Sequence, residues 1–301
     1  MQHLTLGSST VPVANISVVI PAKNEQATIA ALVHSVLQVA AVAEVVVIDD
    51  GSTDDTGKRA TEAGARVVRH PFSLGNGAAI KRGAREAQSE WLLFMDADGQ
   101  HQATDIQRLI EAASADAGTG ADMVVGARDA KGQASIWRRL ANGFYNWFAS
   151  KVTEYPIADL TSGFRLARRA RFVEFLHLLP NGFSYPTTST MAFLRSGYVV
   201  RFVPVTVLKR EGKSHISPLK DGFRFLIIIF KIATLFAPLK VFIPIAAFHF
   251  MLGLARYGYT FISDGTFTNM SALLMVTGVQ IFLIGLVSEQ ITSLIYRDNG
   301  R

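Results

Sequence analysis

The strongest constraint on the fold is a regular alternation of short apolar runs and helix-like segments between residues 16 and 128. Five runs are rich in apolar, often β-branched residues: "ISVVIPA" (16–22), "EVVVIDD" (44–50), "ARVVRH" (65–70), "WLLFMD" (91–96) and "MVVGAR" (123–128). The segments between them are periodic or helix-prone. Near-continuous apolar strands that alternate with helices form a mostly parallel sheet covered on both faces. The sequence therefore predicts an α/β domain with a mostly parallel central sheet. A further helix near 187–196 and a strand over 199–208 are expected after it.

Three of these runs end in clusters of polar residues: "PAKNE", "DDGSTDDT" and "DADGQH". Ligands of parallel α/β sheets bind beyond the carboxyl ends of the strands, so we expect one ligand site to collect all three clusters. Each cluster taken alone is also explained by helix capping or by a solvated turn. Three such clusters at strand ends favour a site.

The third cluster places Asp96, Asp98 and Gln100 two residues apart. In an extended chain, residues two apart point to the same side, so these side chains can converge on one point. Oxygen ligands without His or Cys suit Mg²⁺ or Mn²⁺, and the chain contains no cysteine that would form a thiolate site. Such an ion would neutralise a diphosphate leaving group.

The C-terminal part of the chain is strongly apolar and raises the mean hydropathy to +0.25. Residues 239–262 and 269–288 each offer roughly 20 mostly apolar positions, the length needed to cross a hydrocarbon core. The loop between them has one acid and no base, and the basic residues lie outside the pair, at Arg224, Lys231, Lys240 and Arg297. The positive-inside rule then predicts that both ends of the pair face the cytoplasm. Two buried helices of a soluble domain are the alternative. The mixed basic and apolar residues of 217–237 indicate a helix in the membrane interface.

The chain is basic, with a net charge of +6 and a pI near 9.6. This balance suits nucleic acid, phosphate-bearing ligands or an anionic membrane surface. Basic residues follow the fifth apolar run and precede the membrane segments: Arg128, Arg138, Arg139, Lys209, Arg210, Lys213 and His215. Arginine suits two-point binding of phosphate. Ordinary solvated surface or contact with anionic lipid is the alternative.

Five motifs, "IPAKNE", "DDGSTDDT", "LGNGAAIKRG", "DADGQH" and "SGFRL", occur in an order and spacing that resembles the family 2 glycosyltransferases. Within that family they resemble the dolichyl- or polyprenyl-phosphate sugar synthases. The resemblance covers about residues 15–215. It implies the A-type glycosyltransferase fold, a nucleotide-sugar donor, a divalent metal ion and inversion at the sugar carbon. The Gln-X-X-Arg-Trp motif of the processive polysaccharide synthases is absent from the sequence.

The resemblance also implies roles for individual residues. Those expected to bind the donor are Pro21, Ala22, Asn24, Glu25, Asp49, Asp50, Lys81, Asp96, Ala97 and Asp98. Those expected to bind the metal ion are Asp96, Asp98 and Gln100. Those expected at the acceptor phosphate are Arg128, Arg139, Arg210, Lys213 and His215, and the catalytic residues are Asp98, Arg128 and Arg210. Which of Lys213 and His215 touches the phosphate is left open.

Asp159 occupies the position where a hydroxyl-acceptor enzyme of the family is expected to carry its base. A phosphate monoester has a second pKa near ~6, so a lipid phosphate arrives already charged and needs no general base. We therefore interpret Asp159 as an orienting or structural carboxylate.

The sequence thus predicts a cytoplasmic glycosyltransferase domain (1–215), a juxtamembrane amphipathic helical segment (216–237) and a two-helix transmembrane anchor with a short tail (238–301). The predicted reaction moves a hexose from a UDP- or GDP-sugar to polyprenyl phosphate at the cytoplasmic face of the cell membrane, for envelope glycans or protein glycosylation. No nucleic-acid partner is expected, and self-association is left open. The alternatives are transfer to a hydroxyl of a glycolipid or glycan, and a non-catalytic, membrane-tethered nucleotide-sugar binder.

Overall fold

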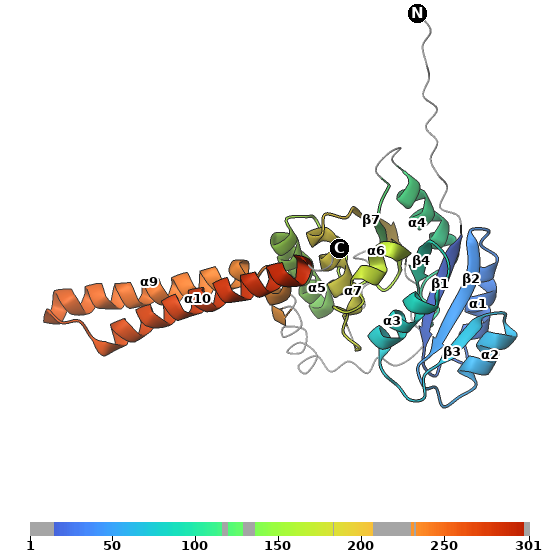
Figure 1. Cartoon of the computed structure of the whole chain (residues 1–301), viewed down its shortest axis with the longest axis horizontal. Coiled ribbons are helices and arrows are strands. Elements are labelled where there is room, and N and C mark those ends of the chain that lie inside the picture. The colour runs from blue at the N-terminus through green and yellow to red at the C-terminus, as the bar shows by residue number, and fades with distance from the viewer. Residues whose placement is uncertain are drawn as a thin grey trace, which may run out of the picture. The chain divides into compact units, whose positions relative to one another are not determined.

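The computed structural model describes residues 15–115, 120–128, 136–182, 184–206, 230–231 and 233–297. Its contacts divide the chain into two compact units, Met1–His215 and Ile216–Arg301. Figure 1 shows the elements of both units, which are described separately below.

The first unit is built on a seven-stranded sheet with the strand order β3-β2-β1-β4-β6-β5-β7. The strands are β1 (Ile16–Ala22), β2 (Val42–Asp49), β3 (Arg66–Arg69), β4 (Trp91–Phe94), β5 (Met123–Arg128), β6 (Arg165–Arg168) and β7 (Val200–Val205). Strands β1 to β4 pair in parallel, and so do β5 and β7. Only β6 runs antiparallel, against both β4 and β5. The predicted α/β fold with a mostly parallel sheet is confirmed.

Helices cover both faces of this sheet. They are α1 (Ile29–Leu37), α2 (Thr56–Glu62), α3 (Asn76–Glu86), α4 (Thr104–Ser114), α5 (Ile136–Thr153), α6 (Arg169–Glu174) and α7 (Tyr185–Arg195). Along β1, Val18 and Ile20 belong to a buried cluster with apolar residues of α1 and α4. Val19 points the other way, where a Cβ on Gly83 of α3 would lie 2.2 Å from its Cγ1. Both orientations along the strand are therefore buried, which explains its continuous apolar sequence.

The reversed direction of β6 determines what lies at the carboxyl edge of the sheet. Arg165, its first residue, pairs with Phe94 at the end of β4. The segment that leads into β6 therefore lies at the same edge as the residues that follow β4. Two parts of the chain that are about 65 residues apart in sequence meet there as a result.

The second unit is a helical hairpin of α9 (Pro238–Asp264) and α10 (Asn269–Arg297), which lie side by side (Figure 1). The helices approach closely at glycines: a Cβ on Gly253 would lie 2.7 Å from Met275, and one on Gly285 would lie 2.7 Å from Phe242. Both helices are long and apolar enough to cross a membrane, and most of their side chains are exposed in the protein. They contain the predicted spans. Most of the predicted interfacial segment lies outside the described residues, although 230–231 and 233–236 are helical.

Candidate functional site

The three polar clusters meet at the carboxyl edge of the parallel strands. In the register of the sheet, Ala22 at the end of β1 pairs with Asp49 at the end of β2, and Val19 pairs with Phe94 of β4. The side chain of Thr28 then links the first cluster to the third, because its hydroxyl donates to the carbonyl oxygen of Ala97 at 2.8 Å. Residues from three separate parts of the sequence therefore surround one region.

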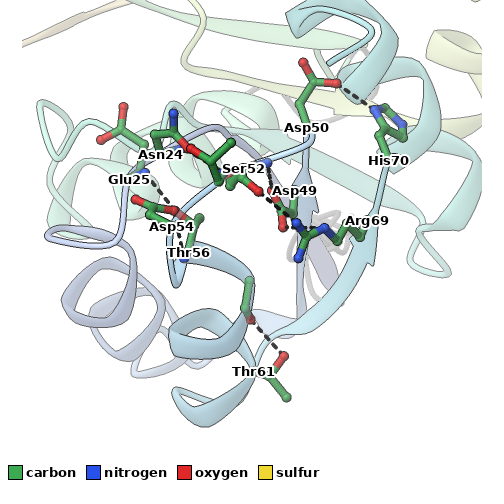
Figure 2. A network of polar contacts seen from close by, with 12 residues as sticks. Asn24, Glu25, Asp49, Asp50, Ser52, Asp54, Thr56, Thr61, Arg69 and His70 are labelled. Carbon is green, nitrogen blue, oxygen red and sulfur yellow. Dashed lines mark hydrogen bonds and ion pairs between the residues drawn. The ribbon is translucent and has the colours of Figure 1, made fainter. Parts of the chain in front are cut away.

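The first and second clusters are joined by reciprocal hydrogen bonds (Figure 2). The amide of Asn24 donates to Ser52 Oγ at 3.0 Å, and Oδ1 of Asn24 accepts from the amide of Thr53 at 2.9 Å. The amide of Glu25 donates to the hydroxyl of Thr56 at 2.8 Å. Asn24 has a positive φ of 55°, a conformation that asparagine tolerates better than most residues. It joins two loops here and does not cap a helix.

Asp50 is almost fully buried, and its carboxylate is surrounded by donors from a single loop. Oδ1 accepts from His70 Nδ1 at 2.7 Å and from the amide of Leu74 at 2.8 Å. Oδ2 accepts from the hydroxyl of Ser73 at 2.7 Å and from the amide of Gly75 at 3.0 Å. Burial by itself would raise the pKa of Asp50, but these hydrogen bonds outweigh it and lower the pKa to about 2. Asp50 therefore fixes the loop between β3 and α3, and a nucleoside would have to share oxygens that already accept four bonds.

Asp49 is also buried, behind the turn that follows β2. Its Oδ1 accepts from the amide of Ser52 at 2.8 Å, and Arg69 Nε lies 3.6 Å from its Oδ2 (Figure 2). Arg69 also donates to the carbonyl oxygen of Ser52 at 2.8 Å. In the structure, the two adjacent acids hold the backbone around the expected donor site.

The third cluster has a donor set that fits a hard divalent cation. Asp98 Oδ1 accepts from the amide of Gln100 at 3.2 Å, and Gly99 between them has a φ of +69°. This tight turn keeps Asp98 and Gln100 together, and with Asp96 two residues earlier the segment offers two carboxylates and one amide. The described parts of the chain contain no group of three His, Cys, Asp or Glu side chains that could hold a metal. An ion there would complete its shell with phosphate oxygens and water, as Mg²⁺ commonly does.

Arg128 at the end of β5 forms a two-point ion pair with Asp159. Its Nε lies 2.8 Å from Oδ2 and its Nη2 lies 3.0 Å from Oδ1. The other acceptor positions of Asp159 are filled by backbone amides, from Arg128 at 3.2 Å, Thr161 at 3.0 Å and Ser162 at 3.1 Å. Burial would raise the pKa of Asp159, but the hydrogen bonds and charge of Arg128 lower it. The same pair raises the pKa of Arg128 against the effect of burial, and the charge of Asp96 contributes.

Lys81, expected at the donor, makes its described contacts elsewhere. Its Nζ donates to the carbonyl of Leu179 at 3.1 Å and to Oδ1 of Asn181. The backbone of the same loop closes the N-terminus of α3, because the amide of Gly77 donates to the carbonyl of Gly182 at 3.2 Å. Lys81 thus ties α3 to the 179–182 loop, and its contact with the donor stays a prediction.

The remaining predicted residues are placed only in part. Pro21 and Ala22 end β1 next to β2, and Ala97 accepts the bond from Thr28. Arg138 and Arg139 belong to α5, but their side chains are not among those described. Arg210, Lys213 and His215 lie outside the described residues.

Several residues that organise the site were not predicted from the sequence. Thr28 and His70 lie outside the quoted motifs and use their side chains to bond residues far away in the sequence. Thr56 ends the second motif, but the motif does not reveal that its hydroxyl accepts from the amide of Glu25. His101, directly after Gln100, is buried and stacks on the ring of Phe164 at 4.7 Å. Burial lowers the pKa of His101, while the charge of Asp98 acts in the opposite direction.

Two family models match the chain, one over each of its two parts. Residues 17–175 match the sequence model of glycosyl transferase family 2, and residues 237–294 match that of the GtrB C-terminal hairpin. The chain is 30% identical to glycosyltransferase AglJ of Haloferax volcanii, over 93% of this chain and 94% of that protein. It is 30% identical to polyprenol monophosphomannose synthase of Mycolicibacterium smegmatis (68% and 82% covered). It is 28% identical to undecaprenyl-phosphate 4-deoxy-4-formamido-L-arabinose transferase of Pectobacterium carotovorum (93% and 88% covered).

Solved structures agree with the fold. The chain resembles glucosyl-3-phosphoglycerate synthase from Mycobacterium tuberculosis with a TM-score of 0.60 and 25% identity, covering 77% of this chain and 85% of that one. The sheet order, the motifs at its carboxyl edge and the match over residues 17–175 agree with one another. The protein is a glycosyltransferase and belongs to glycosyl transferase family 2.

Proposed function

We propose that the protein transfers a hexose from a nucleoside-diphosphate sugar to polyprenyl phosphate, with inversion at the sugar carbon. The observation that carries this proposal is the environment of Asp159. Its oxygens accept bonds from Arg128 and from three backbone amides, and its pKa is lowered. A carboxylate held in this way is a poor general base. A hydroxyl acceptor needs such a base, whereas a lipid phosphate, with its second pKa near ~6, does not.

Arg128 is suited to the acceptor because the ion pair occupies only one edge of its guanidinium. Nε and Nη2 bind Asp159, and in the described part of the chain Nη1 has no hydrogen-bond partner. The side chain is about one-third exposed. Nη1 is therefore the group that we assign to the acceptor phosphate, where a charge-assisted bond to an anion is strong. Arg139, Arg210, Lys213 and His215 are assigned to the same phosphate on the basis of the sequence.

Asp96, Asp98 and Gln100 are assigned to a Mg²⁺ or Mn²⁺ ion and the donor diphosphate. When bound, the ion supplies positive charge that stabilises the diphosphate as it leaves. The similar glucosyl-3-phosphoglycerate synthase structure contains Mn²⁺ and UDP-glucose, which supports an ion with a nucleotide sugar here. The residues at and beyond the ends of β1 and β2, including Glu25, Asp49 and Asp50, are assigned to the surroundings of the nucleoside.

The reaction needs few groups from the protein. An oxygen of the acceptor phosphate attacks the anomeric carbon, the bond from that carbon to the diphosphate oxygen breaks, and the nucleoside diphosphate leaves with the electron pair. Attack from the face opposite the leaving group inverts the configuration. The task of the arginines is to bring two anions together and orient them.

The hairpin supports a membrane location with the catalytic domain in the cytoplasm. Helices α9 and α10 are antiparallel neighbours, so the beginning of α9 and the end of α10 lie on one side of the hairpin. Lys240 and Arg297 lie at these ends, whereas Asp264 lies at the opposite end. This asymmetry follows the positive-inside rule if both ends face the cytoplasm. One relative has undecaprenyl phosphate in its name, and another is named for polyprenol monophosphomannose, which supports a lipid-phosphate acceptor here.

The test is direct: membranes that contain the full-length protein are incubated with labelled polyprenyl phosphate and a panel of UDP- and GDP-sugars. We expect one donor to give a polyprenyl-phosphate-linked sugar, and the Asp98→Ala variant to give none. Sugar transfer to a glycolipid hydroxyl with none to polyprenyl phosphate would replace this function with the hydroxyl-acceptor alternative. Donor binding without turnover of any acceptor would indicate a non-catalytic binder.

A further inference from the structure

A buried arginine lies behind the candidate site, and the proposed reaction does not use it. Arg165, the first residue of β6, is fully buried. Its Nη1 donates to three oxygens of α7: the carbonyl of Pro186 at 2.9 Å, Ser189 Oγ at 2.7 Å and Thr190 Oγ1 at 3.2 Å. Its Nη2 donates to the carbonyl oxygen of Ser162. The guanidinium thus connects α7 to the segment that leads into β6.

Considered only for its effect on folding, a buried positive charge at position 165 is unfavourable. All of these acceptors are neutral, and among the described residues no carboxylate lies within ion-pair distance of Arg165. Its Nε is buried without a hydrogen-bond partner. Burial lowers the pKa of Arg165, against the opposing influence of Tyr185, Asp159 and Asp96. An uncharged side chain of similar volume would avoid this desolvation, so the guanidinium needs a role beyond filling space.

Tyr185 provides a second anchor next to the first. It is the first residue of α7, is buried, and donates from its hydroxyl to the carbonyl oxygen of Gly163 at 3.1 Å. The guanidinium of Arg165 lies over its ring, 5.6 Å from the centroid. The carbonyls of Ser162 and Gly163, which are consecutive in the chain, are therefore both held from the α7 side.

The segment held in this way lies directly against Asp96. A Cβ on Gly163 would lie 2.8 Å from Oδ2 of Asp96 and 3.3 Å from its Cγ. Asp96 in turn follows β4, whose residue Phe94 pairs with Arg165. The backbone of Gly163 thus lies in contact with the carboxylate of Asp96, and Arg165 and Tyr185 hold that backbone in position.

We propose that Arg165 and Tyr185 are positioning residues, which hold the backbone of Ser162 and Gly163 against Asp96 and so fix the carboxylate for the donor diphosphate and its metal ion. The inference rests on the proposed function in one respect, namely that Asp96 faces this ligand. Neither residue touches the substrate. They act as the supporting groups behind metal ligands do, by restricting the orientation of the ligand.

Binding of Mn²⁺ in the presence of UDP or GDP, using the nucleotide with which the wild type binds the ion, tests this without turnover and is followed through the electron paramagnetic resonance signal of free Mn²⁺. The full chain in detergent micelles is compared with three variants: Tyr185→Phe, Arg165→Lys and Gly163→Ala. Tyr185→Phe removes only the hydroxyl that holds Gly163. Arg165→Lys keeps the positive charge but loses the two guanidinium nitrogens that bond α7 and Ser162 at the same time. Gly163→Ala displaces the Asp96 carboxylate directly. Each should raise the dissociation constant of Mn²⁺ about tenfold or more, the loss typical of removing a supporting group.

Matched controls separate positioning from general stability. Tyr198→Phe removes a hydroxyl that donates to Glu174, and Arg66→Lys weakens the ion pair between residue 66 and Glu44. Neither residue approaches Asp96 in the described contacts, so both controls should bind Mn²⁺ as the wild type does. A purely structural role of Arg165 would lower the melting temperature and the folded fraction but leave the dissociation constant of the folded protein unchanged. Wild-type Mn²⁺ affinity in folded Tyr185→Phe and Gly163→Ala would overturn the inference, whatever happens to Arg165→Lys.

The same experiment separates this inference from the proposed function. The Asp98→Ala variant should lose Mn²⁺ binding if the metal assignment is right. If it does, and the three variants still bind as the wild type, only the positioning role falls. If the wild type itself binds no Mn²⁺ with either UDP or GDP, the metal assignment falls and the positioning role falls with it.

Discussion

Arg128 and Asp159 form a two-point ion pair, with Nε 2.8 Å from Oδ2 and Nη2 3.0 Å from Oδ1. The pair joins the end of β5 to the segment before β6, and it neutralises the carboxylate that would otherwise be available as a base. This one ion pair therefore affects both which class of acceptor the site can use and how stably the site is folded.

The Asp159→Asn variant should keep substantial activity with polyprenyl phosphate. No proton has to leave a phosphate nucleophile, and the amide oxygen of asparagine can still accept bonds from the backbone amides of Thr161 and Ser162. The measurement is the initial rate of lipid-linked sugar formation by folded variant and wild type. Loss of turnover in a well-folded Asp159→Asn protein would instead point to a hydroxyl acceptor.

The Arg128→Ala variant should fail mainly in its kinetics against polyprenyl phosphate. Losing a charge-assisted bond to phosphate costs on the order of 1.5–3 kcal/mol, or roughly ten- to hundredfold in rate or apparent affinity. The substitution also leaves the buried Asp159 charge unpaired, which destabilises the fold by on the order of 3 kcal/mol. The double variant Arg128→Ala/Asp159→Asn removes that charge, so it should regain thermal stability without regaining acceptor affinity. Recovery of both would show that Arg128 acts only through Asp159.

Removal of the metal should abolish turnover reversibly. Because Asp98 and Gln100 are the assigned ligands, Asp98→Ala should be inactive, and EDTA should stop the wild type until Mg²⁺ or Mn²⁺ is added back. Glu111→Gln is the control, since Glu111 is an exposed acid of α4. Full activity of the wild type in EDTA would exclude the metal role.

Asp50 should make stability depend on pH below about 4. Its folded pKa is about 2 and its ordinary value is 3.8, so the folded state binds this proton more weakly than the unfolded state. The ionised carboxylate of Asp50 therefore contributes about 2 kcal/mol to the free energy of unfolding. This contribution is fully present above pH 4 and disappears as the pH falls through the pKa of the folded state. Asp50→Asn should lower the melting temperature clearly at pH 7, and the gap to the wild type should narrow between pH 4 and pH 2. The exposed Asp55 serves as the control, and Asp55→Asn should show no such narrowing.

The topology of the hairpin has a separate test. Since Lys240 near the start of α9 and Arg297 at the end of α10 lie on one side of the hairpin, a reporter fused after Arg301 should read as cytoplasmic, and one inserted at Gly265 should read as external. The reverse pattern would put the catalytic domain on the side without nucleotide sugars.

The fold was predictable where the information is local. The five apolar runs specify buried parallel strands because their period and length leave few alternatives, and the polar clusters follow from where those strands end. The antiparallel insertion of β6 was not predictable, because its four residues pair with strands about 40 and 75 residues away in sequence.

The site was predictable at the level of residue types but not of contacts. Acids at the end of β2 were expected to face the donor, yet four donors from the loop at His70 to Gly75 surround the carboxylate of Asp50. Lys81 was expected near the diphosphate, and its described contacts are with Leu179 and Asn181. Complete burial of Arg165 contradicts the usual preference of arginine for the surface. Each of these outcomes depends on partners distant in sequence, which no local pattern reveals.

The packing of the α9 and α10 hairpin limits how the proposed lipid-linked product could cross the membrane. The two helices touch directly at Gly253, Gly278 and Gly285, and two helices in contact have no interior through which a hydrated sugar could pass. Carrying a sugar and a phosphate through hydrocarbon exposes many polar groups that cannot be hydrogen-bonded there. If the proposed lipid-linked sugar is made on the cytoplasmic side and used on the other, a single hairpin therefore cannot turn it over in the bilayer, and the step needs a translocating protein or an assembly of several hairpins.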